Sequence, residues 1–432
     1  MKNLLKLIVT AMLFVVLGAC SGETAEDEAS ENIEAYELNE ANQANESNES
    51  NQTNESNQAN QSSEQEESGA VMSNQLAVPE NVYPRRIRIE GNYFVVGDDS
   101  RRIWINGVNT PWNNWNDFAG DNFDYEWWDE HFAALRANGV NASRVWINCT
   151  NNFGRANNHG LEYVVSIDEN GMVSGVSERH WENLDSFFEI AARHGIYIMA
   201  TILSFDHFQY NEWHNSEPER WRNMLQSTEA INSFIEHYTI PFVERYRDNP
   251  FLWSIDLMNE PDWVHENEAA GRIEWEYISN FFARNTASIR QNSEILVTVG
   301  MAFSKYNSDL HVGNMVSDKI FQILYDNPYA ALDFWSPHYY DWMYQWFWHP
   351  FTMTPEEWGM CSSKPSINGE TTGHGTEGFT LVEDYVNAMN NGWQGVMAWT
   401  SSGVDDHGSF DDVITATRHI AYLFPELVWP PN

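Results

Sequence analysis

The sequence contains few cysteines, which limits how covalent cross-links could stabilise it. Only Cys20, Cys149 and Cys361 occur among 432 residues. Cys149 follows one predicted strand and Cys361 precedes a later one, so parallel strands would place them at opposite ends of a sheet. We therefore expect two free thiols in the folded part, although the predicted compartment is oxidising.

Positive charge is also scarce. Lys and Arg number 23 against 63 Asp and Glu, which gives a formal net charge of −40 at pH 7. The first 80 residues hold 15 acidic and 2 basic residues, so −13 of this charge lies there and −27 in the rest. This balance argues against nucleic acids and anionic polymers as partners, and it suits an uncharged substrate.

Cofactor motifs and long apolar runs are missing. No glycine-rich phosphate loop, flavin motif or convincing metal-ligand spacing occurs, so neither a cofactor nor a bound metal is expected. The acidic stretch Asp405–Asp412 lacks the spacing of a calcium loop and is interpreted as a solvated loop. The apolar run Leu7–Val16 is too short to span a membrane comfortably.

The first 20 residues have the composition of a targeting signal. Lys2 and Lys6 begin it, and Leu17-Gly-Ala-Cys20 follows the apolar run. These four residues resemble the lipobox of bacterial lipoproteins, in which the cysteine is acylated and becomes the new N-terminus. The resemblance implies a signal peptide over 1–20, acylation at Cys20 and anchoring to the bacterial cell membrane or surface. A secretory signal with an unrelated cysteine is the alternative.

Residues 21–80 form a distinct segment, dominated by Asn, Glu, Ser, Gln and Ala in a loose repeat. Such a composition cannot bury enough apolar surface to fold, so a disordered acidic linker is predicted. A flexible coil of about 60 residues spans roughly 45 Å. The linker would hold the globular part, residues 81–432, away from the membrane as a monomer whose only membrane contact is the lipid anchor.

From residue 86 onward, short apolar strands alternate with amphipathic helices, as in an α/β fold. The segment 86–96 predicts a β-hairpin, which we expect to plug the floor of a barrel. Eight strands are predicted after it, at 103–108, 142–147, 197–204, 252–258, 295–299, 334–338, 365–369 and 396–399. This count matches a (β/α)8 TIM barrel with enlarged βα loops. A doubly wound sheet is the alternative, which the missing phosphate loop leaves without support.

Helices are predicted between these strands from apolar positions at helical spacing. The clearest cover 125–138, 178–194, 228–246, 271–291, 381–391 and 412–423. Gly139 and Gly195 directly follow the first two and are typical helix-ending residues. Two further helices, near 316–324 and 355–360, are less well defined.

Two glutamates stand at the ends of predicted strands. Glu260 follows the strand 252–258 and Asn259, and Glu370 directly follows the strand 365–369. Functional groups of a (β/α)8 barrel lie where strands end and βα loops begin, so the two carboxylates should meet at the barrel mouth. Such a pair is what acid/base and nucleophilic cleavage of a glycosidic bond requires. For each glutamate taken singly, a loop or helix-capping role is the alternative.

Further strand-end residues make the pattern specific. In chain order, strands 2, 4, 6, 7 and 8 end in Arg144, Asn259-Glu260, His338-Tyr339-Tyr340, Glu370 and Trp399. This set resembles glycoside hydrolase family 5, within the clan of retaining (β/α)8 glycosidases, over roughly residues 85–425. The resemblance implies that Glu260 is the general acid/base and that Glu370 is the nucleophile forming a glycosyl-enzyme intermediate.

Three polar residues are expected beside the glutamates. A buried arginine at a strand end needs a carboxylate partner, so Arg144 should support Glu370, together with Tyr340. By the same resemblance, Asn259 would donate to the sugar 2-hydroxyl. A structural ion pair is the alternative for Arg144, and a turn role is the alternative for Asn259.

Four ring side chains complete the expected substrate site. The resemblance implies that Trp399 forms the floor of the −1 subsite and that His338 orients a glutamate or a sugar hydroxyl. His207, after the third strand, and Trp112, after the first, would contact sugar. Ordinary core packing is the alternative for Trp399 and for His338.

Aromatic residues crowd the predicted loops, where their flat apolar faces could stack on sugar rings. They include Trp112, Trp115, Trp146, Trp213, Trp263, Trp342, Trp346 and Trp348. A row of such rings implies several subsites, which favours cleavage inside a polysaccharide chain.

We therefore expect a retaining endo-β-1,4-glycanase acting on a neutral polysaccharide, either mannan or a cellulose-type β-glucan. An exo-acting β-mannosidase or β-glucosidase is the first alternative. A non-catalytic carbohydrate-binding lipoprotein is the more distant one, and it would predict the loss of a catalytic glutamate, whereas both glutamates are present.

Overall fold

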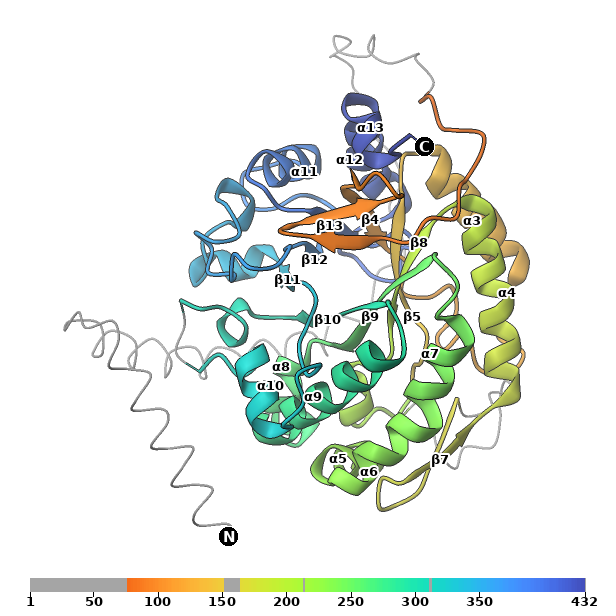
Figure 1. Ribbon diagram of the computed structural model, residues 1–432, viewed down its shortest axis with the longest axis vertical. Helices are drawn as coiled ribbons and strands as arrows, with labels where there is room; N and C mark the ends of the chain where they lie inside the picture. The colour runs from red at the N-terminus through yellow and green to blue at the C-terminus, as the bar shows by residue number, and fades with distance from the viewer. Residues whose placement is uncertain (1–75, 151–163, 213, 311–312, 432) are drawn as a thin grey trace, which may run out of the picture. The chain divides into compact units, whose positions relative to one another are not determined.

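A computed structural model describes residues 76–150, 164–212, 214–310 and 313–431. Eight parallel strands close into a barrel in the order β10-β11-β12-β13-β4-β5-β8-β9, with helices around it (Figure 1). The barrel strands are β4 Ile105–Asn109, β5 Ala142–Trp146, β8 Tyr197–Thr201, β9 Leu252–Asn259, β10 Leu296–Met301, β11 Ser336–Tyr339, β12 Asn368–Thr372 and β13 Gly395–Trp399. The predicted (β/α)8 architecture is confirmed. The predicted signal peptide, Cys20 and residues 21–75 of the linker lie outside the described residues.

The barrel strands owe their position to near-continuous apolar runs. All eight residues of β9 are buried, as are all five of β5, β8 and β13. Strands covered on both faces bury side chains in both directions, so the alternation of polar and apolar residues disappears. Polar residues that interrupt such a run, such as Asp256 in β9, therefore need partners inside the barrel.

The predicted hairpin closes one end of the barrel. β1 Arg88–Glu90, β2 Tyr93–Val96 and the short β3 Arg101–Arg102 form a three-stranded antiparallel sheet, the orange segment of Figure 1. Phe94 packs edge-on against Trp253 and Phe334, with ring centroids 5.3 and 5.4 Å away. These rings share one apolar cluster with residues near the starts of the barrel strands, among them Ile105, Ala142, Tyr197 and Ile367. The hairpin thus plugs the amino-terminal end, as predicted.

Six of the predicted helices are present with small shifts at their ends. They are α3 Tyr125–Ala137, α4 Glu178–His194, α9 Trp275–Asn292, α10 Asp318–Leu324, α11 Leu381–Asn390 and α12 Phe410–Leu423. Gly195 ends α4 in the left-handed conformation, with φ of 66°, and its N–H bonds the last turn of the helix.

Two helix predictions were wrong in detail. The single helix expected over 228–246 is interrupted: α6 Thr228–Phe234 and α7 Ile240–Tyr246 flank a π-helical turn, Ile235–Thr239. Pro241 has no N–H, and its ring crowds the preceding turn, so the helix widens there. Residues 355–360 form turns instead of a helix, because Pro355 and Gly359 leave room for only one turn.

Several elements had no clear sequence signal. The antiparallel pair β6 Val165–Ile167 and β7 Val173–Val176 and the helices α5 Pro218–Gln226, α8 Pro261–Glu266 and α13 Pro425–Val428 lie in or beyond the enlarged loops. All are short, and α5, α8 and α13 each begin with a proline, which is favoured at the first helical position.

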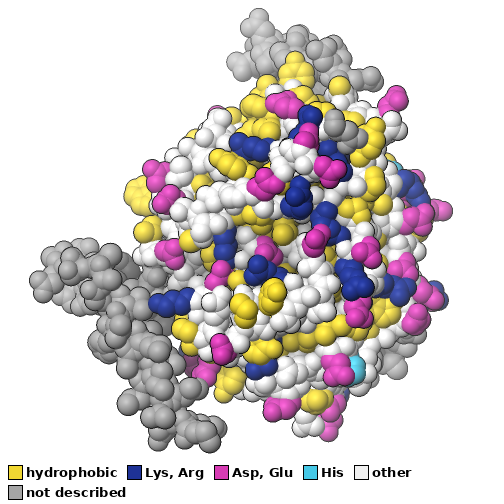
Figure 2. Space-filling model, viewed as in Figure 1, with side chains coloured by type: hydrophobic (Ala, Val, Ile, Leu, Met, Phe, Trp, Pro, Cys, Tyr) yellow, Lys and Arg dark blue, Asp and Glu magenta, His cyan; other side chains and the backbone are white. Residues whose placement is uncertain are grey.

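The two cysteines of the described chain are not cross-linked. Cys149 is buried and Cys361 is partly buried, and both are free thiols, as predicted. None of the helices in the described ranges has the length and apolar character needed to cross a membrane. Figure 2, viewed from the same direction as Figure 1, shows basic and acidic side chains interspersed on that face.

A cavity of about 300 Å³ lies near the plug. Its lining includes Val82, Arg136 and Trp429 and none of the predicted catalytic residues.

Candidate active site

The backbone brings the two glutamates to the same end of the barrel. Glu370 lies within β12, where it is the register partner of His338 on β11. Glu260 lies between β9 and α8 in the left-handed conformation, with φ of 50°. Left-handed backbone is uncommon outside glycine and clusters at functional sites. Pro261 then starts α8, so the strand-to-helix turn is sharp and the Glu260 side chain stays at the mouth.

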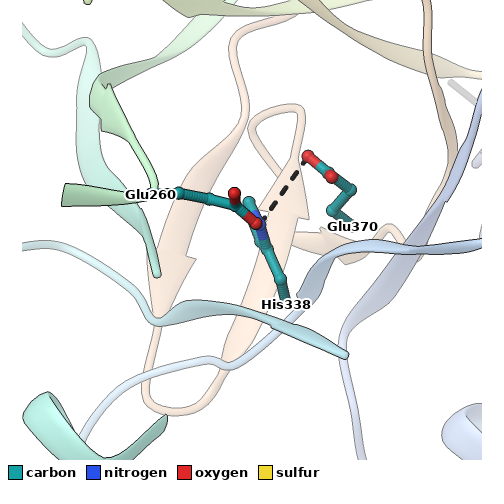
Figure 3. Close-up of side chains that lie close together, drawn as sticks. All are labelled: Glu260, His338 and Glu370. Atoms are coloured by element: carbon teal, nitrogen blue, oxygen red, sulfur yellow. Dashed lines mark hydrogen bonds and ion pairs between the residues drawn. The ribbon is translucent and has the colours of Figure 1, made fainter. Parts of the chain in front are cut away.

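The carboxyl groups of Glu260 and Glu370 face each other across His338 (Figure 3). His338 Nδ1 lies 3.0 Å from Glu260 Oε1 and 3.6 Å from Glu370 Oε2. One oxygen from each glutamate and a His338 ring nitrogen all lie within 4.8 Å of one another. This separation fits the short spacing of about 5–5.5 Å for retaining glycosidases, rather than the 6.5–9.5 Å, roughly, for inverting ones.

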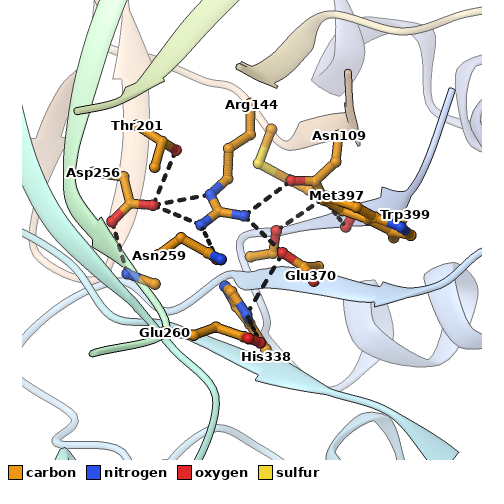
Figure 4. A network of polar contacts seen from close by, with 12 residues as sticks. Asn109, Arg144, Thr201, Asp256, Asn259, Glu260, His338, Glu370, Met397 and Trp399 are labelled. Carbon is orange, nitrogen blue, oxygen red and sulfur yellow. Dashed lines mark hydrogen bonds and ion pairs between the residues drawn. The ribbon is translucent and has the colours of Figure 1, made fainter. Parts of the chain in front are cut away.

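Arg144 connects Glu370 to the barrel interior (Figure 4). Its Nη1 lies 2.8 Å from Glu370 Oε2 and its Nη2 lies 2.7 Å from Asp256 Oδ2. Its remaining donors reach Asn109 Oδ1 at 3.1 Å and Asn259 Oδ1 at 2.9 Å. A completely buried guanidinium is tolerated because each charged group has a partner. Arg144 therefore acts on Glu370 and Asn259 and exposes no surface of its own.

Asp256 is a further carboxylate in this network, and its place there was not predicted from the sequence. It accepts from Arg144, from Thr201 Oγ1 at 3.1 Å and from the Gly300 N–H at 2.8 Å. Strand register brings these groups together, since Asp256 pairs with Thr201 across β9 and β8. One acidic residue in the middle of an apolar strand was the available signal, because a buried charge must be paired.

Gly300 on β10 lets the charged groups approach one another. An added Cβ at this position would lie 2.7 Å from Arg144 Nη2 and 2.8 Å from His338 Nε2. His338 Nε2 is buried without a hydrogen-bond partner, so this nitrogen faces the glycine. A neutral imidazole with its proton on Nδ1 fits this arrangement, because the proton then points at the two carboxylates.

Each glutamate receives a second donor from a ring side chain. The Tyr340 hydroxyl donates to Glu370 Oε1, while Arg144 donates to the other oxygen. The Trp263 indole N–H donates to Glu260 Oε2 at 3.0 Å. Trp263 appeared in the sequence only as one of several loop aromatics, and its link to Glu260 comes from its place three residues later, in the first turn of α8.

Burial dominates the protonation of Glu260. Desolvation raises its pKa from 4.5 to about 7, against the opposing effects of Arg144 and the Trp263 hydrogen bond. A carboxyl group with a pKa near 7 can hold a proton at neutral pH and release it to a reacting oxygen.

Different neighbouring groups set the pKa values of Glu370 and His338. Desolvation raises the pKa of Glu370 and Glu260 adds to this, whereas His338, Arg144 and Tyr340 oppose it. Glu370 has an arginine in direct contact, and Glu260 has none, so Glu370 is the better placed of the two to remain ionised. Burial lowers the pKa of His338 to about 4, which keeps the ring neutral at ordinary pH.

Four tryptophans pack together around Trp399, which lies near Glu370 in Figure 4. Trp146 and Trp399 lie 5.5 Å apart, and Trp112 lies 6.1 and 6.4 Å from them, with Trp115 4.8 Å from Trp112. The Trp399 indole donates to Asp405 Oδ2 at 2.8 Å, which fixes its ring, and the Trp399–Thr400 peptide bond is cis. Trp112 is half-buried and Trp399 keeps 8% of its surface exposed. Partly exposed rings at fixed angles suit stacking on a sugar.

Asn259 and His207, the other two residues predicted to contact sugar, differ in how far they are exposed. Asn259 keeps 6% of its surface exposed, and its Nδ2 is 3.5 Å from Ser204 Oγ, a long contact that leaves a donor available. His207 is completely buried: its Nδ1 accepts the Ser204 N–H, and its ring packs edge-on against Trp221. The predicted aromatic residue Trp213 lies outside the described residues.

Within the described ranges, Glu260, His338 and Glu370 form a group that could ligate a cation. The Arg144 guanidinium 2.8 Å from Glu370 would oppose a cation there. In the acidic stretch at 405–412, Asp405 accepts from Trp399 and from the His407 N–H. Asp412 accepts from the backbone N–H of Ser409, the residue that caps the start of α12. The protein's own donors thus engage these carboxylates.

Comparisons with known proteins agree with this fold. No family model matches the chain. It is 21% identical over 352 residues to a mannan endo-1,4-beta-mannosidase of the mussel Mytilus edulis, a match covering 74% of this chain and 89% of that protein. The solved structure of an endo-1,4-beta-mannanase from Eisenia fetida superposes with a TM-score of 0.65 at 17% identity, covering 78% and 95% of the two chains. A glycoside hydrolase family 5 mannosidase from Rhizomucor miehei superposes with a TM-score of 0.50 at 13% identity, covering 79% and 99%.

Proposed function

We propose that this protein is a retaining endo-β-1,4-mannanase of the glycoside hydrolase family 5 type. The observation that carries the proposal is the carboxylate pair: two glutamates from separate strands, with oxygens within 4.8 Å of each other. Arg144 contacts Glu370 and favours its ionised form, whereas burial favours the protonated form of Glu260. The similarity to mannan-cleaving enzymes supports mannan over a β-glucan as substrate.

In the first step, Glu370 attacks the anomeric carbon, and Glu260 gives its proton to the departing glycosidic oxygen. Arg144 and the Tyr340 hydroxyl, each bonded to one Glu370 oxygen, orient the nucleophile and keep it ionised until it reacts. Because both partners are themselves held by the barrel, little reorganisation accompanies the attack.

In the second step, Glu260, now ionised, takes a proton from water as the water attacks the glycosyl-enzyme and frees Glu370. His338 Nδ1 stands between the two carboxylates and can stabilise whichever carries the negative charge. Asn259, oriented by Arg144, would donate to the 2-hydroxyl, a contact that strengthens in the transition state. Trp399 would form the floor under the reacting sugar, with Trp112 beside it.

Mannan and glucan differ in the axial or equatorial 2-hydroxyl, which lies next to Asn259 in this mechanism. The deciding experiment compares sugar release from β-mannan and carboxymethylcellulose, with NMR following the anomeric configuration of the first products. We expect β-configured oligosaccharides of several lengths from mannan. Release of single mannose units would instead indicate the exo-acting alternative, and products of inverted configuration would refute the double displacement.

We also propose that the N-terminal segment anchors the enzyme outside the cytoplasm. The support is the sequence alone: Leu17-Gly-Ala-Cys20 at the end of a signal-like stretch, followed by the acidic segment 21–80. In a bacterial host, the full chain should incorporate labelled fatty acid and fractionate with membranes, and Cys20→Ala should do neither. Equal labelling of the two proteins would contradict acylation at Cys20.

A further inference from the structure

Trp263 makes a contact with the catalytic machinery that has no part in the mechanism above. It lies in the first turn of α8, and its indole N–H bonds Glu260 Oε2 at 3.0 Å. Its backbone N–H also bonds the Glu260 carbonyl, at 3.2 Å. Glu260 therefore has a left-handed backbone, and its side chain folds back onto α8, the helix that follows it.

The two oxygens of Glu260 are held by different elements. Oε1 accepts from His338 on β11, a strand across the mouth, and Oε2 accepts from Trp263 on α8. The His338 N–H is also within 3.6 Å of Glu370, so it is available to either carboxylate. The indole N–H has Glu260 as its acceptor in the described structure. Trp263 is therefore the donor dedicated to the acid/base.

The Trp263 ring is itself fixed in place. It packs against Phe303, with ring centroids 5.2 Å apart, and against Trp342 at 6.4 Å. The Phe303 N–H donates to the buried carboxylate of Asp262, which lies on α8 two residues after Glu260. The helix and the loop after β10 thus clamp the ring whose N–H reaches Glu260.

We propose that Trp263 is a positioning residue for the acid/base: its N–H fixes Glu260 Oε2 and stabilises the ionised carboxylate that must activate water in the second step. This inference rests on the proposed function. The acid step needs the protonated form of Glu260 and the base step needs the ionised form, so a donor that favours the ionised form shifts the balance toward the second step.

Several charged groups also surround Glu260. Arg144, on β5, also favours the ionised form, whereas Asp256 on β9 disfavours it. Glu370 on β12, Asp206 in the turn after β8 and Asp262 on α8 also interact with Glu260 as like charges. Tyr340, after β11, is a neutral neighbour whose ionisation Glu260 opposes. None of these groups is altered when the indole N–H alone is removed.

The test replaces Trp263 with phenylalanine and, as an isosteric variant, with 3-benzothienylalanine, which has sulfur in place of the N–H. Proteins labelled with ¹³C at glutamate carboxyls are titrated by NMR, and the Glu260 signal is assigned by its loss in Glu260→Gln. A hydrogen bond to a charged group corresponds to a shift of about one pKa unit, so the Glu260 midpoint should rise from near 7 by about one.

The alkaline limb of kcat/KM on mannan should move upward by the same amount. At a pH below the Glu260 midpoint, a rise of about one pKa unit lowers the ionised fraction about tenfold. Pre-steady-state kinetics with a dinitrophenyl β-mannoside at such a pH should show the second step slowed about tenfold, while the first, which needs no acid with this leaving group, is retained. Trp342→Phe is the matched control, since it replaces an indole that packs against Trp263 and that donates nothing to Glu260; it should leave the midpoint unchanged.

An unchanged Glu260 midpoint in the benzothienylalanine variant would overturn the inference, as would an equal rise in Trp342→Phe. If Trp263→Phe fails to fold, the isosteric variant decides. Failure of the proposed function has a different signature: the wild-type protein would not cleave mannan, whereas the NMR titration would still report whether the N–H stabilises the carboxylate.

Discussion

The two ends of the barrel use the same strands for opposite purposes. On β9, Trp253 near the amino-terminal end stacks with Phe334 at 5.1 Å beneath the plug, whereas Asp256 and Asn259 farther along bind Arg144. At the plug end, apolar burial supplies stability without directional demands. At the mouth, buried charges are kept by mutual pairing, and such pairs contribute little net stability. Stability and chemistry are thus assigned to opposite ends of a strand only eight residues long.

The largest effect should come from the nucleophile at the mouth. Glu370→Gln keeps the size of the side chain but removes its charge, so turnover of mannan should fall by at least about 10⁴-fold. The unfolding midpoint in urea should change little, because the amide oxygen can still accept from Arg144, the amide N–H can donate to the Tyr340 oxygen, and Asp256 still pairs with Arg144. Activity within about 100-fold of the wild type would exclude Glu370 as the nucleophile.

The converse test is made at the plug. Phe94 is completely buried between Trp253 and Phe334, so Phe94→Ala should lower the free energy of unfolding by about 3–5 kcal/mol. Chemical denaturation measures this, and kcat/KM of the folded fraction should stay within about twofold of the wild type. A parallel loss of activity at a temperature where the variant is folded would show that the two ends are coupled.

Gly300 tests how tightly the mouth is packed. Gly300→Ala adds a Cβ 2.7 Å from Arg144 and 2.8 Å from His338, so both groups, or the strand that carries Gly300, must move. A displacement of about 1 Å at the reacting groups can cost on the order of 100-fold in rate. We expect a comparable fall in kcat with a smaller change in KM. Gly175→Ala, on β7, serves as a control for expression and folding, because no atom lies within 4 Å of the added Cβ and the backbone there is not left-handed.

A smaller effect should appear in the pH dependence of stability. The pKa of Glu260 is raised from 4.5 to about 7 in the folded protein, so the folded state binds its proton more tightly than the unfolded chain does. This contribution to stability is complete below pH 4.5 and is lost as the pH rises through 7. Glu260→Gln removes the loss, so it should gain roughly 2–3 kcal/mol relative to the wild type between pH 4.5 and 8. Urea unfolding at both pH values measures the difference, and no pH-dependent gain would mean that Glu260 is not desolvated.

The sequence predicted the barrel well because its strands are long apolar runs and its helices carry clear apolar faces. Strand-end positions also predicted which polar residues share the mouth, including Arg144 beside Glu370. The missed contributors depend on register and on contacts across the sheet. Asp256 lies opposite Thr201, and Gly300 lies among polar groups from three other strands, and neither relation is visible along a single strand.

Local loop geometry was similarly hidden. His207 was expected to contact sugar, but the turn Phe205–Phe208 directs its ring inward, against Trp221. Trp263 was one loop aromatic among many until the left-handed turn at Glu260 placed its N–H on the carboxylate.

Both ends of the described chain come together at the plug. Arg85 donates to the backbone oxygen of Pro430, and Val82 packs on the apolar cluster beneath the strands. Joining these ends with a short peptide and opening the chain in a distant loop should therefore yield a circular permutant of the barrel. Linking the protein to a bead through either end would likewise leave the catalytic opening directed away from the support.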